Sequence, residues 1–247
     1  MLLLQPSGLS TVHRDAQDSG RFVIDMLLHR RSSLVRDVAL DSAVSALAQN
    51  FLPAGEAYFF YDQLFVKEPF TTTRTQWHQD LPYWPLLGTE VPSLWLALTD
   101  CNEKTSSVQY VCGSHLGQRY VATNHETRDS DKAGGLDICP DYHLEKPQRT
   151  DTIIRYSLEA GDVVIHHPLV VHGAGPNGGA SRRIGLSFRY CAGTVRWDRR
   201  PKTMFFPGTE HIVNGASFLE QDVFPQLQIR RSNHGRSEGN SRTSQQR

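Results

Sequence analysis

The spacing of hydrophobic residues changes near residue 55, and the change divides the chain into two parts. Before it, residues 18–31 and 41–50 carry apolar side chains three or four positions apart, the period of an amphipathic helix. The first segment ends in basic residues, which suit a helix C-terminus, and Pro53 and Gly55 follow the second. We therefore predict two helices, set by Phe22, Val23, Met26 and Leu27 and by Val44, Leu47 and Ala48.

After residue 55 the hydrophobic runs are short and rich in β-branched and aromatic residues, with Gly and Pro between them. Such runs predict strands, and many short strands favour a sandwich or barrel, the class that includes jelly rolls. Residues 122–150 are polar and without a period, so we predict a loop over one end of the barrel. The predicted strands are 56–67, 93–99, 108–111, 152–158, 163–167 and 182–190.

Length predicts one mainly β domain over residues 1–230, with its helices at the N-terminal end. Residues 231–247 have almost no apolar side chains, and we predict a disordered polar tail there because such a segment buries too little to fold.

Composition argues against several classes of function. Lys plus Arg and Asp plus Glu both total 26, so no positive excess favours nucleic acid. The four cysteines have no metal-site or disulfide-scaffold spacing, which suits free thiols in a reducing compartment. The first residues lack the basic part of a signal peptide, and no apolar run approaches the ~20 residues of a bilayer span. We expect a cytoplasmic protein that binds neither nucleic acid nor a membrane.

The triplet His-x-Asp occurs twice and is the first candidate for metal chemistry. On a strand, residues i and i+2 face the same side, so an imidazole and a carboxylate point to one place. His13 and Asp15 lie in a polar lead-in where a strand is not expected, and we interpret them as surface residues. His78 and Asp80 follow the β-rich run and are the preferred pair.

A second histidine from a distant strand would complete a 2-His-1-carboxylate triad, which leaves coordination positions open on iron. His166, His167 and His172 compete for this place. His172 ends a short strand before a Gly-rich turn and is our candidate, whereas we interpret His166 and His167 as structural residues.

Two arginines begin the next predicted strand. Arg183 comes eleven residues after His172, directly after Arg182, and only one of the two can face inward. A buried guanidinium suits the distal carboxylate of 2-oxoglutarate because it can bind both oxygens. Arg183 shares its face with the small residues Gly185 and Ser187, which would leave room for a ligand, so we expect Arg183 to face inward.

The chain resembles the phytanoyl-CoA dioxygenase (PhyH) family in five segments that occur in order. These are 61–69, 77–85 (WHQDLPYWP), 93–98, 111–115, and 161–183 with its Gly-Asp, His-Gly and Arg. The resemblance implies a double-stranded β-helix, the cupin-like jelly roll, with Fe(II) held by His78, Asp80 and His172. It implies that Arg183 anchors 2-oxoglutarate, and that Gln63 and Trp95 border the co-substrate. Ala174 and Cys112 depart from the usual hydroxyl and proline of the family.

The implied function is an Fe(II)- and 2-oxoglutarate-dependent dioxygenase that uses O2 to hydroxylate a C–H bond of a small metabolite. Asp80 argues against a halogenase, which needs the carboxylate position vacant. Two alternatives stay open: a non-catalytic jelly-roll binding or sensing protein, and a cupin-type metalloenzyme that does not use 2-oxoglutarate. No Lys/Arg cluster favours the phosphates of an acyl-CoA, and the loops at 86–92 and 122–150 carry no recognisable substrate code.

Overall fold

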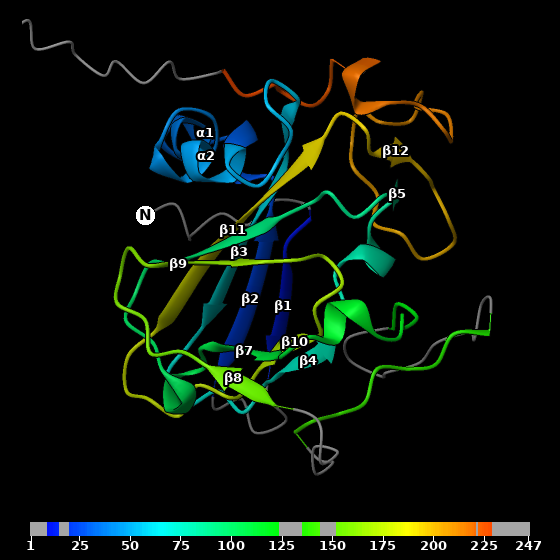
Figure 1. Cartoon of the computed structure of the whole chain (residues 1–247). Coiled ribbons are helices and arrows are strands. Elements are labelled where there is room, and N and C mark those ends of the chain that lie inside the picture. The colour runs from blue at the N-terminus through cyan, green and yellow to red at the C-terminus, as the bar shows by residue number, and fades with distance from the viewer. Residues whose placement is uncertain (1–8, 15–19, 124–134, 144–151, 221, 229–247) are drawn as a thin grey trace, which may run out of the picture.

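The structure is a computed structural model that describes residues 9–14, 20–123, 135–143, 152–220 and 222–228. Two antiparallel sheets dominate it (Figure 1): a six-stranded sheet in the order β1-β2-β3-β11-β6-β9, and a four-stranded sheet in the order β4-β10-β7-β8. The strands of the large sheet are β1 Thr11–Arg14, β2 Arg21–Met26, β3 Ala57–Lys67, β6 Ser93–Ala97, β9 Val163–His166 and β11 Arg183–Ala192. Those of the small sheet are β4 Thr75–His78, β7 Val108–Val111, β8 Ile153–Arg155 and β10 His172–Ala174.

The chain passes repeatedly between the two sheets. From β3 to β11, four strands join the large sheet and four the small one, while β5 Leu86–Leu87 pairs with β12 Arg196–Trp197 in a separate ribbon. This crossing pattern is the jelly roll, so the predicted fold class is confirmed. Large-sheet strands β3 and β11 pair along almost their whole length, with a shift in register between Arg189 and Tyr190. They are the two longest strands and lie side by side in the interior of the large sheet.

Two helices pack at one end of the large sheet (Figure 1): α1 Ser33–Leu40 and α2 Ala43–Gln49. Ser32 and Ser42 cap their N-termini through side-chain oxygens that accept backbone N–H groups. Tyr190 on β11 donates its hydroxyl to the carbonyl of Ala39, which ties α1 to the sheet. The helix predicted at 41–50 is confirmed as α2, whereas α1 was not predicted.

The helix predicted at 18–31 is wrong. Its residues form strand β2 and a short 3-10 helix, η2 Leu28–Arg30. Alternate residues of β2 line the cavity between the sheets, namely Phe22, Ile24 and Met26. The segment therefore follows the two-residue period of a strand. Pairing with β3 supplies the backbone hydrogen bonds that a helix would have made internally.

Strand β1 corrects a second expectation, since His13 lies on it and not in an irregular lead-in. It pairs with β2 at the sheet edge, with His13 opposite Phe22. Asp15, most of the loop at 122–150 and the predicted tail at 231–247 lie outside the described residues. No described helix is long and apolar enough to cross a membrane. The four cysteines are free thiols, as expected.

Candidate metal centre and adjoining cavity

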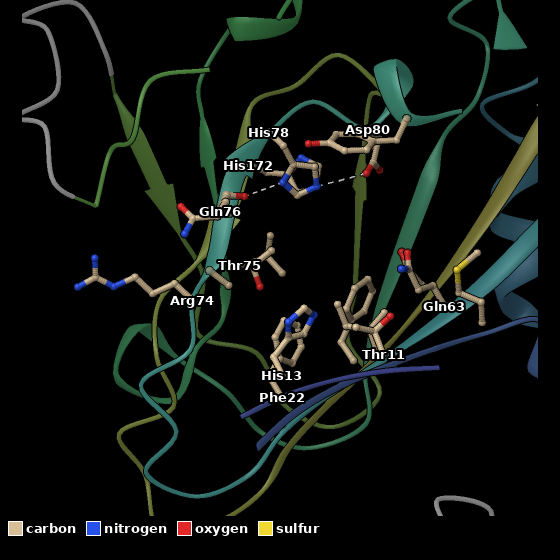
Figure 2. Close-up of a pocket in the computed structure, with 18 of the residues that line it drawn as sticks. Thr11, His13, Phe22, Gln63, Arg74, Thr75, Gln76, His78, Asp80 and His172 are labelled. Carbon is tan, nitrogen blue, oxygen red and sulfur yellow. Dashed lines mark hydrogen bonds and ion pairs between the residues drawn. The ribbon is translucent and has the colours of Figure 1, made fainter. Parts of the chain in front are cut away.

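A cavity of about 1400 Å³ lies between the two sheets and contains every candidate site residue. Figure 2 shows His78, Asp80 and His172 together on one side of it, with Thr11, His13 and Phe22 across from them. The cavity is therefore bounded by the small sheet, which carries the metal candidates, and by the N-terminal strands of the large sheet.

Strand pairing brings the two histidines together. His172 on β10 lies directly opposite His78 on β4, and their ring centroids are 4.3 Å apart. Each ring is oriented by the main-chain carbonyl of the residue two positions earlier in the sequence. His78 Nδ1 is 2.7 Å from the oxygen of Gln76, and His172 Nδ1 is 3.0 Å from that of Val170. Because a carbonyl can only accept, both Nδ1 atoms carry the proton and both Nε2 lone pairs face the cavity.

Asp80 reaches the same place by a route that differs from the predicted one. Strand β4 ends at His78, and Asp80 has helical backbone angles (φ −71°, ψ −46°) just before the 3-10 helix η3 Leu81–Tyr83. The buried side chain of Gln79 fixes the turn between them: it donates to the carbonyls of Gln118 and Leu169 and accepts the N–H of Tyr120. The turn, and not strand alternation, therefore brings the carboxylate of Asp80 to the same place as the imidazole of His78.

The two oxygens of Asp80 have different surroundings. Oδ1 is 3.5 Å from His78 Nε2 and 3.8 Å from His172 Nε2, so it faces the histidine pair. Oδ2 accepts from the hydroxyl of Ser93 at 3.1 Å, and His166 Nε2 and Arg189 Nη2 lie 3.4 and 3.9 Å away. One oxygen is held by protein and the other is left for a ligand.

Electrostatics favour the protonation states that bind a metal. Burial raises the pKa of Asp80, but its neighbours, which include the guanidinium of Arg189 and a hydrogen bond from His166, outweigh burial and hold this pKa well below its usual value. Burial lowers the pKa of His172 well below its usual value and lowers that of His166 as well. Asp80 is therefore anionic, and His166 and His172 are neutral at neutral pH.

These three side chains fit a divalent transition metal. One ligand atom from each of His78, Asp80 and His172 lies within 4.8 Å of the other two, and this is the one such group among the described residues. Two imidazole nitrogens and one carboxylate oxygen on one side leave the opposite positions open, the arrangement typical of non-haem Fe(II) oxygenases. The donor set and the convergence of the two Nε2 atoms and Oδ1 both suit Fe(II).

Arg183 lies deeper in the cavity and is 2% exposed, whereas its neighbour Arg182 points outward to an ion pair with Glu68. The predicted orientation of the two arginines is confirmed. Arg183 Nη2 donates to the hydroxyl of Ser106 at 3.2 Å, but its Nε has no partner. Burial lowers the pKa of Arg183 to about 10, so it remains cationic at neutral pH.

The surroundings of Arg183 are those of an anion site. The hydroxyl of Ser187, four residues after Arg183 and on the same face of β11, is also buried without a partner. Buried donors without acceptors are rare in proteins and indicate a group that binds there. Asp80 is the one carboxylate among the described residues that line the cavity. An acidic group fits this part of the cavity.

Gln63 and Trp95 flank Ser187 on the neighbouring strands β3 and β6, and both line the cavity. Gly185 was expected to leave room for a ligand, and this expectation is wrong. A Cβ at Gly185 would lie 2.1 Å from Cζ2 of Trp95, so the indole ring fills that space. The glycine instead allows Trp95 to lie flat beside Arg183, whose guanidinium carbon is 5.7 Å from the ring centroid.

His166 and His167 were interpreted as structural, and neither belongs to the group of possible metal ligands. His166 is buried in the cavity wall with a hydrogen bond to Asp80, and His167 lies outside the cavity and accepts the N–H of Leu169. Arg189 shares the inward face of Arg183 and Ser187 on β11 and was not considered. Continuing the alternation along this strand would have found it.

The fold and site together define a jelly-roll protein with a candidate 2-His-1-carboxylate iron centre in the same cavity as a buried arginine whose Nε has no partner. The sequence profile of the phytanoyl-CoA dioxygenase (PhyH) family matches residues 8–185, and the chain belongs to this family.

Two curated relatives show how far the likeness extends. A Stutzerimonas stutzeri protein named "Probable alpha-ketoglutarate-dependent hypophosphite dioxygenase" is 28% identical over 166 residues, which are 62% of this chain and 53% of the relative. A Caenorhabditis elegans protein named "Probable phytanoyl-CoA dioxygenase" is 31% identical over 121 residues, or 48% of this chain and 36% of the relative. The chain thus spans between a third and about half of the length of these relatives.

Two solved structures from nogalamycin biosynthesis share the fold. The non-heme alpha ketoglutarate dependent epimerase SnoN has a TM-score of 0.67 at 23% identity, and the match covers 90% of this chain and 82% of SnoN. The carbocyclase SnoK has a TM-score of 0.66 at 25% identity, with 89% and 81% covered. The match to SnoN shows the fold alone.

Proposed function

We propose that this chain is an Fe(II)- and 2-oxoglutarate-dependent dioxygenase that hydroxylates a C–H bond of a small metabolite. One observation carries the proposal: a 2-His-1-carboxylate group and a buried arginine with an unpartnered N–H line the same cavity. The names of the relatives, which include alpha-ketoglutarate-dependent enzymes, support it. We assign the iron to His78, Asp80 and His172, and the distal carboxylate of 2-oxoglutarate to Arg183.

The overall reaction would consume substrate, 2-oxoglutarate and O2 and give hydroxylated substrate, succinate and CO2. Bound Fe(II) would supply the place where O2 and 2-oxoglutarate react and the oxidising power that removes a substrate hydrogen. The backbone carbonyls of Gln76 and Val170 keep the two Nε2 atoms aimed at the metal. Ser93 holds Asp80 Oδ2, so that Oδ1 is presented to the metal.

Arg183 would orient the co-substrate and hold it in place. Ser106 fixes one arm of the guanidinium, which limits its motion and leaves the unpartnered Nε–H for the carboxylate. Gln63, Trp95 and Ser187 would border the co-substrate between Arg183 and the metal. Ala174 lines the cavity where relatives carry a hydroxyl, so no hydrogen bond comes from that position.

Two alternatives make different predictions. A cupin-type metalloenzyme would not need a buried cation in the cavity, and a binding protein would not need the open side of the metal. The experiment is incubation with Fe(II), 2-oxoglutarate, O2 and a metabolite library, with succinate as the measured product. We expect succinate from the wild type and none without Fe(II) or from the His172→Ala variant. Iron-dependent oxidation without succinate would support the cupin-type alternative. The absence of any product would support the binding protein.

The four free cysteines support our proposal that the protein works in a reducing compartment such as the cytoplasm. We also propose that residues 1–230 act as a single domain. Localisation of the tagged protein and limited proteolysis would test these two points.

A further inference from the structure

Arg189 is a buried cation for which the proposed reaction has no use. It lies in a row of inward residues across the large sheet, between Tyr61 on β3 and Ser93 on β6. Its side chain is 3% exposed, and its guanidinium carbon lies 4.7 Å from the ring centroid of Tyr61 and 5.9 Å from that of Trp84. Aromatic faces therefore hold the guanidinium in position at the edge of the cavity.

The hydrogen-bonding capacity of Arg189 is largely unused. Its Nη2 lies 3.9 Å from Asp80 Oδ2, beyond hydrogen-bond distance, and its Nε and Nη1 have no partner. Asp80 is already the carboxylate ligand assigned to the metal. Two buried guanidinium N–H groups without acceptors are unfavourable unless a further anion joins them.

The balance of charge in the cavity points the same way. Of the described residues that line it, the buried charged groups are Asp80, Arg183 and Arg189. Fe(II) and the dianion of 2-oxoglutarate would cancel one another, and Asp80 would cancel one arginine. One positive charge then remains in a poorly solvated site.

The rest of the cavity suits an organic molecule with a negative group. Cationic side chains at its more exposed positions are Arg14, Arg74 and Lys202, and these would attract an anion from solution. Its far wall comes from β1 and β2 and carries the apolar side chains of Val12, Phe22, Ile24 and Met26 beside the polar Thr11 and His13. At about 1400 Å³ the cavity has room for a substrate in addition to 2-oxoglutarate.

We propose that the substrate is an organic oxyanion, a carboxylate or phosphonate, whose acid group binds Arg189; this proposal rests on the proposed function. Arg183 and Arg189 then divide the work, with Arg183 holding the co-substrate and Arg189 the substrate. Because Arg189 lies beside Asp80, the carbon that is oxidised is only a few bonds from the acid group.

The test uses the full chain loaded with Fe(II) and 2-oxoglutarate without oxygen. The probes are hexanoate, hexylphosphonate and the uncharged hexanamide, with dissociation constants measured by calorimetry. We expect at least one acid to bind the wild type roughly 30-fold more tightly than the amide, the lower end of the effect of a buried charge pair. In Arg189→Gln the ratio of acid to amide should fall to about one, and Arg189→Lys should restore part of it.

Two control variants separate this proposal from the function on which it rests. Arg182→Gln, on the outer face, should leave the ratio unchanged, and Arg183→Gln should weaken 2-oxoglutarate binding. Equal binding of acids and amide by the wild type, or no binding of any probe while 2-oxoglutarate still binds, would overturn the oxyanion proposal alone. A larger effect of Arg189→Gln on 2-oxoglutarate than on the acids would also overturn it, because Arg189 would then belong to the co-substrate. Failure of 2-oxoglutarate to bind the iron-loaded wild type would instead count against the proposed function.

Discussion

The two sheets hold their functional side chains in different ways. In the small sheet, His78 and His172 lie on strands of four and three residues, and each is oriented by the main-chain carbonyl two positions earlier in the sequence. In the large sheet, Arg183 and Arg189 lie on a strand of ten residues that pairs on both sides. The metal ligands thus depend on local main-chain geometry, whereas the cationic groups depend on the register of a long strand. Damage to the large sheet should therefore spare Fe(II) binding, whereas loss of Fe(II) from the small sheet should also weaken the binding of 2-oxoglutarate, which the metal would chelate.

The largest effect should come from breaking the small-sheet site. His172→Ala removes a metal ligand and should weaken Fe(II) binding by more than the ~10–100-fold that is typical of loss of a neighbouring hydrogen-bond partner. Iron-dependent turnover should disappear. Metal titration under anaerobic conditions checks this, with His167→Ala as the control because that ring lies outside the cavity. Equal loss of iron in both variants would show that the distal ligand has been misplaced.

Arg183→Ala should give the next largest effect, and on a different ligand. Loss of a charge-assisted partner in a desolvated pocket typically costs ~2–5 kcal/mol, so 2-oxoglutarate should bind roughly 30-fold to several-thousand-fold more weakly. Fe(II) affinity should be nearly unchanged, because the three ligands are untouched. Arg183→Lys should restore only part of the binding, since an ammonium lacks the planar fork.

The matched control is Arg182→Ala, which removes an exposed ion pair with Glu68 and should be nearly neutral. The readout is the 2-oxoglutarate dissociation constant with Fe(II) bound. A larger effect at Arg182 than at Arg183 would contradict the register of β11.

Gly185→Ala tests whether Trp95 supports the arginine. The new Cβ would lie 2.1 Å from the indole, so the ring must move. Such overpacking typically costs ~1–3 kcal/mol of the free energy of unfolding, and 2-oxoglutarate should bind more weakly as Trp95 leaves Arg183. Gly175→Ala is the control, because nothing lies within 4 Å of its Cβ. Denaturant unfolding that gives equal stability for the two variants would count against the packing argument.

Ser93→Ala should give the smallest effect and is the one that connects the sheets. Ser93 belongs to the large sheet but donates to Asp80, so its loss should weaken Fe(II) binding by ~10-fold. The affinity for 2-oxoglutarate at saturating Fe(II) should hardly change. Unaltered Fe(II) affinity would mean that Asp80 needs no support at Oδ2.

Sequence reasoning succeeded where one strong local rule decided the outcome. Alternation along β11 placed Arg183 inward, and the His-x-Asp triplet together with His172 at the end of a short strand selected three residues whose ligand atoms lie within 4.8 Å of one another. It failed where tertiary pairing overrode local preference: β2 has a helical pattern of apolar residues but pairs with β3. The role of His166 was also out of reach, because its contact with Asp80 joins residues 86 positions apart.

The cavity is proposed to hold Fe(II) and 2-oxoglutarate together, and anaerobic binding of 2-oxoglutarate with and without Fe(II) tests this directly. The measurement is equilibrium dialysis of labelled 2-oxoglutarate against the wild type and His172→Ala. We expect tight binding only for the wild type with Fe(II), since chelation by the metal and the Arg183 contact must act together. Binding that is equally tight without Fe(II), or absent from the iron-loaded wild type, would contradict the account.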